Sequence, residues 1–139
     1  MISKTGIHAA TALASLASLR PGEYAGSVAI AREIGAPQNY LGKLLNLLAG
    51  EGLVQSQKGF GGGFRLARRA DKISLYDVVE PIDRVSRWGD CFLQGGKCKP
   101  ENPCAVHNRW KTIREEYLKF LKETTVEDLA QRRVDIRKG

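Results

Sequence analysis

The sequence predicts a mainly α-helical fold with one small β-hairpin, and three observations support this prediction. Apolar residues recur at helical spacing in the first half of the chain, two short β-type runs flank a glycine-rich stretch, and a long helical pattern occupies much of the second half. The 139 residues suffice for one compact domain, or for a small domain with an appended element, and 42% hydrophobic residues suffice for a core.

Three helices are expected in the first 50 residues. Residues 4–19 are rich in Ala and Leu and apolar on nearly all sides, which predicts a buried helix. "SVAIAREIG" predicts a short second helix with Ser27 as its N-cap and Gly35 just past its end. "PQNYLGKLLNLLAGEG" then predicts a third helix in which Pro37 takes the first helical position.

The third helix has an apolar face and a polar face. The apolar stripe consists of Leu41, Leu44, Leu45 and Leu48. The opposite stripe is uncharged to basic and consists of Gln38, Asn39, Gly42, Lys43 and Asn46. Two short helices joined by a Gly-containing turn, the second with such a face, are typical of a helix-turn-helix, although an ordinary helical hairpin has a similar pattern.

The next segment favours the helix-turn-helix. "LVQSQ" and "FRLAR" are strand-like runs that flank "KGFGGG", and three consecutive glycines permit the positive φ angles of a tight hairpin tip. A hairpin directly after the second helix of a helix-turn-helix is a wing. We therefore predict a winged helix-turn-helix DNA-binding domain over residues 1–84.

A fourth helix is expected within "SLYDVVEPID". Ser74 and Asp77 have the spacing of a capping box. Pro81 lacks a backbone N–H and is expected to end or kink this helix near Glu80.

Residues 105–139 are expected to form a dimerisation helix, from about residue 105 to 122, and a C-terminal tail that opens with a second capping box, Thr124 with Glu127. Large apolar residues recur along the helix at spacings of four, three, four and three, the seam of a coiled coil. These residues are Val106, Trp110, Ile113, Tyr117 and Phe120. The seam favours a symmetric homodimer over a helix packed only on its own domain.

The charge distribution indicates a polyanionic partner. Residues 1–70 contain 8 Lys/Arg and 3 Asp/Glu, a net charge of +5, whereas residues 71–139 contain 14 and 12, a net charge of +2. The basic excess in the predicted DNA-binding half suggests double-stranded DNA. The longest weakly polar run, "IHAATALASLASL", is too short and too polar to span a bilayer, so no membrane partner is expected.

All three cysteines lie in the segment over residues 85–104, which we expect to be a cluster-binding loop. An odd number of cysteines cannot form a complete disulfide framework, which favours free or ligating thiols in the reducing cytoplasm. Cys91, Cys98 and Cys104 are separated by six and five residues, and His107 follows after two more. Thiolates suit iron-sulfur clusters, zinc or Cu(I), but the spacing is too long for a zinc ribbon, and a bacterial ferredoxin needs four closely spaced cysteines.

Three thiolates and a fourth ligand from elsewhere suit a small, chemically exposed iron-sulfur cluster, which favours a sensor. Bare redox-active thiols, a zinc site and a Cys104–His107 nucleophile pair are the alternatives.

With these residues in hand, the chain resembles the Rrf2 family of bacterial winged-helix regulators, in particular its IscR-like and NsrR-like members. The likeness rests on "ISKTGIHAATALASLA", "YLGKLLNLLAGEGLVQSQKGFGGGFRLAR", "SLYDVVEPID", the cysteine loop and "LKFLKETTVEDL". It implies a homodimeric DNA-binding regulator with, in many members, a 2Fe-2S cluster that responds to redox state, iron-sulfur status or nitric oxide.

The resemblance also implies ligand positions. Cys91, Cys98 and Cys104 match the ligand cysteines, and His107 matches the position of the fourth ligand in IscR-like members. In nitric-oxide-sensing and related members, a carboxylate from the partner chain's first helix is the fourth ligand instead. His8 occupies that position and is the second candidate.

The third helix is expected to enter the major groove and to read DNA with residues near its N-terminal half. Gln and Asn pair with adenine, and Lys reaches guanine or a phosphate. The expected contacts are Gln38, Asn39, Tyr40 and Lys43 on the helix, with Lys58 and Arg65 on the wing. Lys58 matches a basic family position that reaches DNA, whereas Arg65, Arg68 and Arg69 either contact phosphates or form an ordinary solvated face.

The predicted function is therefore a DNA-binding transcriptional regulator with an iron-sulfur sensor. A cluster-free or zinc-containing regulator of the same fold is the alternative, and an iron-sulfur electron carrier is the second alternative, although a carrier has no need of a wing. No enzyme is expected, because the sequence has neither a P-loop lysine after its glycines nor a serine elbow.

Overall fold

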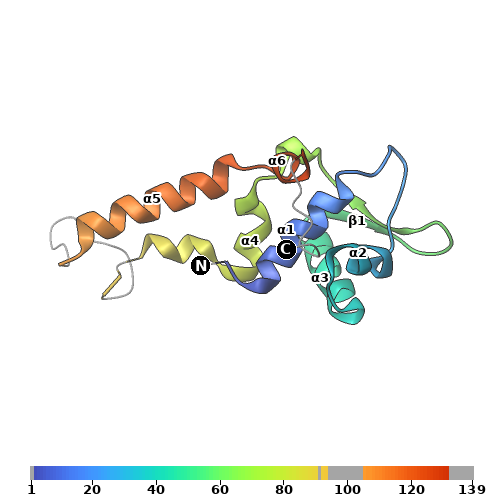
Figure 1. Cartoon of the computed structure of the whole chain (residues 1–139), viewed down its shortest axis with the longest axis horizontal. Coiled ribbons are helices and arrows are strands. Elements are labelled where there is room, and N and C mark those ends of the chain that lie inside the picture. The colour runs from blue at the N-terminus through green and yellow to red at the C-terminus, as the bar shows by residue number, and fades with distance from the viewer. Residues whose placement is uncertain (1, 91, 94–104, 132–139) are drawn as a thin grey trace.

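The structure is a computed structural model of the 139-residue chain, and it describes residues 2–90, 92–93 and 105–131. The described residues form helices and one antiparallel hairpin, which confirms the predicted fold class (Figure 1). In chain order the elements are α1 (Lys4–Leu16), α2 (Ser27–Ile34), α3 (Gln38–Gly50), β1 (Val54–Gln57), β2 (Gly63–Leu66), the 3₁₀ helix η1 (Ala70–Lys72), α4 (Leu75–Asp83), the 3₁₀ helix η2 (Val85–Gly89), α5 (His107–Glu123) and α6 (Val126–Gln131).

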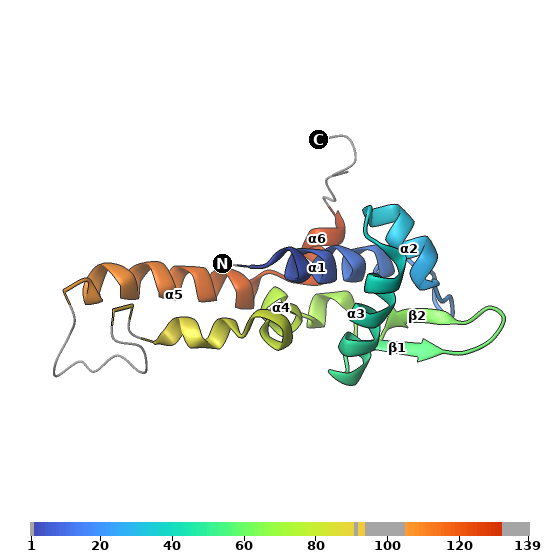
Figure 2. The ribbon, with the colours of Figure 1, turned by 90° about the horizontal axis from the view of Figure 1, so that it is seen from below.

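The elements separate into a helical body with a wing at one end and a long helix at the other. α1, α2, α3 and the hairpin lie together, and α5 extends away from them beside the segment that follows α4 (Figures 1 and 2). α6 returns the chain to the body, where it packs on α1. The wing and the far end of α5 therefore mark opposite ends of the molecule.

One apolar core joins the body to the C-terminal helices. The predicted leucine stripe of α3 is buried, with Leu41, Leu45 and Leu48 at 0% exposure. Leu121 from α5 and Val126 from α6 belong to the same core, also at 0% exposure. The end of α5 and the start of α6 are thus packed into the winged-helix core.

The helix-turn-helix has its turn at Gly35, as predicted. This residue has φ 75° and ψ 31°, a left-handed conformation that glycine adopts without steric cost, and its N–H donates to the Ala31 carbonyl. The predictions for Ser27 as N-cap and Pro37 as first helical residue are each wrong by one position. Gly26 and Pro37 have extended backbones (ψ 153° and 136°), so each helix begins at the following residue.

The predicted wing is confirmed as the antiparallel pair β1–β2, in a register that places Val54 opposite Leu66 and Gln55 opposite Arg65. Ala25 adds a bridge to β2, because its N–H donates to the Phe64 carbonyl (2.9 Å) and its carbonyl accepts from the Phe64 N–H (2.8 Å). The segment before α2 therefore fixes the base of the wing.

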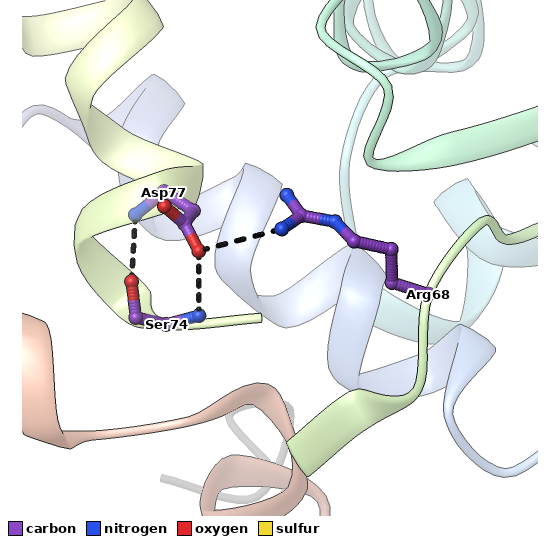
Figure 3. A network of polar contacts seen from close by, with 3 residues as sticks. All are labelled: Arg68, Ser74 and Asp77. Atoms are coloured by element: carbon purple, nitrogen blue, oxygen red, sulfur yellow. Dashed lines mark hydrogen bonds and ion pairs between the residues drawn. The ribbon is translucent and has the colours of Figure 1, made fainter. Parts of the chain in front are cut away.

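The capping box at the start of α4 is present as predicted. The Ser74 Oγ accepts from the Asp77 N–H (3.0 Å), and the Asp77 Oδ2 accepts from the Ser74 N–H (3.1 Å). The same carboxylate lies 4.0 Å from the Arg68 guanidinium, just after the wing (Figure 3). Both side chains of this ion pair are partly exposed, so it contributes little to stability.

Of the two predicted effects of Pro81, an end or a kink of α4 near Glu80, the end is wrong, because the helix continues to Asp83. Proline removes only its own N–H, and the Arg84 N–H still donates to the Glu80 carbonyl (2.9 Å). Val78 and Val79 on this helix are fully buried, and such packing stabilises a helix against the missing hydrogen bond.

The second capping box lies one residue later than predicted, at Thr125 and Asp128 instead of Thr124 and Glu127. The Thr125 N–H donates to Asp128 Oδ2 (2.9 Å), and the Asp128 N–H donates to Thr125 Oγ1 (3.1 Å). Thr124 instead caps α5, and its carbonyl accepts from the Leu75 N–H (2.7 Å). A pairing between distant segments therefore sets the position of this box.

Candidate functional site

The exposed face of α3 presents the polar residues predicted to read DNA. Gln38, Asn39, Lys43 and Asn46 are exposed, while the leucine stripe on the other side of the helix is buried. The structure thus brings Gln38, Asn39 and Lys43 together over the first two turns. This arrangement leaves amide and ammonium groups available to base edges and phosphates.

Tyr40 is placed differently from its three neighbours. Its side chain is half-buried against the core, and its hydroxyl lies 3.2 Å from the Nδ1 of His8 on α1. The two rings meet edge to face at 5.5 Å between centroids. Tyr40 therefore links α3 to α1, and the buried His8 has a defined partner in its own chain.

Gly42 has no packing requirement for its missing side chain. A Cβ at this position would lie 3.7 Å from Ser27 Oγ, an ordinary van der Waals contact. Glycine inside a helix lowers stability by about 1 kcal/mol relative to alanine. The described structure therefore contains no packing reason for a glycine at this position.

On the wing, Lys58 is exposed and Arg65 is held in place. The Arg65 Nε donates to Gln55 Oε1 (3.0 Å), and its guanidinium lies 4.8 Å from the centroid of the Tyr24 ring. Sequence reasoning did not identify Gln55 and Tyr24 as orienting residues. Gln55 is the cross-strand partner of Arg65, so the register of the predicted hairpin was the available signal.

The other two arginines near the wing are paired with carboxylates. The Arg69 Nη2 donates to Asp71 Oδ2 (2.8 Å), and Arg68 lies beside Asp77 as described above. These pairs favour a role at the junction between the wing and α4.

The predicted dimer seam divides between two sides of α5. Trp110 and Tyr117 are half-buried toward their own chain, where burial raises the pKa of Tyr117. Ile113 and Phe120 are 60% and 51% exposed. Val106 is half-buried and immediately precedes the helix.

Cys91, Cys98 and Cys104 lie outside the described residues, but both flanks of Cys91 are placed. The Trp110 Nε1 donates to the Asp90 carbonyl (3.0 Å), and the Phe92 ring lies 5.3 Å from the Trp110 ring. His107 is the first residue of α5, one turn before Trp110. The described ranges themselves contain no group of three or more His, Cys, Asp or Glu that could hold a metal ion.

The donor set of this loop fits an iron-sulfur cluster. Three thiolates are soft ligands, and an imidazole at the start of α5 adds a fourth donor of a kind found at such clusters. The contacts of Trp110 bring the chain on either side of Cys91 close to the helix that begins with His107. The donor types of the segment and the position of residues 90 and 92 beside α5 are both compatible with such a site.

A winged helix-turn-helix with a polar reading helix and a basic wing defines a DNA-binding regulator. Residues 2–132 match the Rrf2 family, described as "Iron-dependent Transcriptional regulator". The chain belongs to this family, and it is a transcriptional regulator of the type represented by IscR and CymR. Its relatives are transcriptional regulators and not enzymes, as the sequence predicted.

Two relatives and one solved structure illustrate the likeness. An HTH-type transcriptional regulator of Aquifex aeolicus is 36% identical over 102 residues, which cover 72% of this chain and 71% of that protein. IscR of Klebsiella pneumoniae is 31% identical over 100 residues, which cover 72% of this chain and 61% of IscR. The structure of CymR, the global cysteine regulator of B. subtilis, has a TM-score of 0.77 at 27% identity and covers 94% of this chain and 96% of CymR.

None of the helices in the described ranges is long and apolar enough to cross a membrane.

The His8 environment generates a prediction about pH. Burial, reinforced by the positive charge of Lys4, lowers the pKa of His8 below its ordinary value of 6.5. Below about pH 6.5, His8 therefore binds a proton more readily in the unfolded chain than in the folded chain. The free energy of unfolding falls as the pH falls for this reason. The wild type should lose more stability than His8→Gln between about pH 7.5 and about pH 5.5, as measured by urea denaturation at fixed protein concentration.

Tyr40→Phe is the matched control. It removes the hydroxyl but keeps the ring that buries His8, so the pH dependence of its stability should equal that of the wild type. Identical pH dependence in the wild type and His8→Gln would contradict the assignment.

Proposed function

We propose that this regulator binds operator DNA as a homodimer and senses redox state, iron-sulfur status or nitric oxide through a 2Fe-2S cluster held by Cys91, Cys98, Cys104 and His107. The observation that carries the proposal is the double contact of Trp110 with Asp90 and Phe92, which brings the chain on either side of Cys91 to the N-terminal part of α5. A regulator of this kind acts where the chromosome lies, which in a bacterium is the cytoplasm.

The cluster residues would hold the cofactor at the junction between η2 and α5. A bound cluster supplies an iron centre that can be oxidised, reduced, nitrosylated or lost. His107 is preferred as fourth ligand because it is the first residue of α5 and is half-buried, whereas His8 is 9% exposed and engaged with Tyr40. His8 from the partner chain is the second candidate, and its ligation would require it to leave Tyr40.

The DNA contacts follow from the exposed face of α3. Gln38 and Asn39 carry amides suited to adenine, and Lys43 is suited to guanine or phosphate. Lys58 and Arg65 extend the contact from the wing to phosphates. Tyr40 contributes at most its exposed edge, because its hydroxyl is directed at His8.

The dimer contact is assigned to the exposed apolar residues of α5. Ile113 and Phe120 are seven residues apart and therefore lie on one side of the helix. Pairing of two such helices would place two winged helix-turn-helix domains, here called reading heads, on one DNA duplex. A change in the cluster loop at one end of α5 would then alter the spacing of the reading heads and, by linkage, the affinity for DNA.

A cluster-free or zinc-containing regulator that responds to thiol oxidation or to another ligand is the second candidate. The likeness to CymR supports it, because the name of that protein refers to cysteine and not to iron. The electron-carrier alternative is not retained, since the relatives are transcriptional regulators.

Cluster content is the first prediction of this proposal. Protein purified without oxygen should show visible charge-transfer bands with matching iron and sulfide, and His107→Ala should change the spectrum or lower the iron content. His8→Ala is the matched control and should retain the wild-type spectrum. An unchanged spectrum in His107→Ala would reverse the order of the two histidines, and a colourless, iron-free protein that binds DNA would favour the second candidate.

DNA binding is the second prediction. Lys43→Ala should weaken operator binding by about 1 to 3 kcal/mol if Lys43 reads a base, and Lys58→Ala should reduce the salt dependence of binding by about one phosphate contact. Fluorescence anisotropy titrations at several salt concentrations measure both quantities. Lys72→Ala, an exposed lysine on η1, is the control that should bind like the wild type. Unchanged affinity in both test variants would refute this docking.

The oligomeric state is the third prediction. Ile113→Lys combined with Phe120→Lys should convert a dimer to a monomer in sedimentation velocity, because it places charges in the proposed apolar contact. Glu115→Lys changes the net charge by the same amount on the other side of α5 and should remain dimeric. A dimeric double variant would place the interface elsewhere.

A further inference from the structure

The tip of the wing carries an aromatic side chain that nothing covers. Phe60 has a relative exposure of 109%, the highest among the exposed large hydrophobic residues of the described chain. The loop that contains it projects beyond the helices at the end of the molecule (Figure 2). A fully hydrated aromatic ring is unfavourable in water, and burial against a partner would recover its hydrophobic contribution.

The loop presents this ring on a tightly folded turn. Gly59 and Gly61 on either side of Phe60 have φ angles of 93° and 76°, and the Gly62 N–H donates to the Gly59 carbonyl (3.0 Å). A Cβ on Gly62 would collide with the Gln57 carbonyl. Only glycines permit this compact turn, so its single side chain, that of Phe60, is presented from a defined position.

The wing is also fixed relative to the reading helix. The backbone pair between Ala25 and Phe64 joins β2 to the segment before α2, and a Cβ on Gly63 would collide with the Ala25 carbonyl. α2 packs on α3. When α3 occupies a groove of DNA, the position of the wing tip is therefore set by the protein fold.

The wing itself carries positive charge and no carboxylate. Lys58 lies two residues before Phe60 and Arg65 lies on β2, and residues 52–67 contain no Asp or Glu. This charge favours a nucleic-acid surface over an apolar protein partner. The grooves of DNA alternate across each sugar-phosphate strand, so an element that passes the phosphates beside the major groove meets the minor groove.

The minor groove is wide enough to admit the Phe60 side chain but not the whole hairpin. This groove is about 6 Å wide, whereas a two-stranded ribbon needs the major groove, about 12 Å wide. Apolar side chains, including Phe, enter the minor groove in other proteins by inserting between base steps, which bends the duplex. A planar ring at the end of a glycine turn is suited to this insertion.

We infer that Phe60 is a DNA-inserting wedge that partly unstacks one base step in the minor groove beside the reading helix. The inference rests on the proposed DNA-binding function. It adds a residue through which the protein would favour DNA sequences that deform easily. Pyrimidine–purine steps unstack most easily, so the wedge favours such a step at the wing position of the operator.

The test uses duplexes selected from a random-sequence library by the full-length wild-type protein. Phe60→Ala should bind these duplexes roughly tenfold more weakly, with an unchanged salt dependence because no charge is removed. It should also reduce the bend reported by energy transfer between the duplex ends, and a fluorescent purine analogue at the wing-facing step should lose its unstacking signal. Phe60→Leu, which keeps an apolar wedge, should retain most of the affinity and bend.

Lys58→Ala distinguishes the effect of charge from that of insertion. It should lower the salt dependence of DNA binding and leave the bend of the duplex unchanged. The urea midpoint of Phe60→Ala should match that of the wild type, because the ring is fully exposed in the free protein. Wild-type affinity and bend in Phe60→Ala, together with weakened binding by Lys43→Ala, would overturn the wedge and leave the proposed function intact. Failure of the wild type to select any duplex would overturn both.

Discussion

The pairing between the start of α4 and the end of α5 is the constraint on which the rest of this architecture depends. The Leu75 N–H donates to the Thr124 carbonyl (2.7 Å), and the Val126 N–H donates to the Ile73 carbonyl (2.9 Å). Ile73 and Val126 are both fully buried, so these hydrogen bonds lie beside the core. Because the long helix enters the winged-helix core here, its direction relative to the reading head is set by backbone pairing and apolar burial together.

This attachment makes α5 the connection between the winged-helix core and the start of the cysteine segment. Its C-terminal end is fixed in the core through Leu121, and its N-terminal end holds the entry to the cysteine loop through Trp110. The segment that enters the loop is itself tied to α4, since Ser86 donates through its N–H and its Oγ to the Glu80 carboxylate (2.8 and 2.5 Å). Short, defined contacts thus connect the start of the cysteine segment to α4, which packs on α1.

The surface proposed to face DNA combines packed support with exposed polar groups. α3 is buried along its leucine stripe, Tyr40 ties it to α1, and the Ala25–Phe64 bridge holds the wing. The side chains proposed to contact DNA therefore project from elements whose positions are determined by packing. Such preorganisation reduces the entropy that binding must remove.

The sequence by itself determined the helical periodicity, the leucine stripe, the turn at Gly35, the glycine-tipped hairpin and the capping box at Ser74, because each depends on residues close together in the chain. The sequence also predicted the exposed polar face of α3, because helical geometry alone separates that face from the leucines.

Only the tertiary structure decided which residues meet across the chain. It moved the second capping box to Thr125, joined His8 to Tyr40, and divided the seam of α5 between its own domain and solvent. These outcomes depend on contacts between residues tens of positions apart, where burial and backbone pairing outweigh local preference, and no spacing rule in the sequence contains that information.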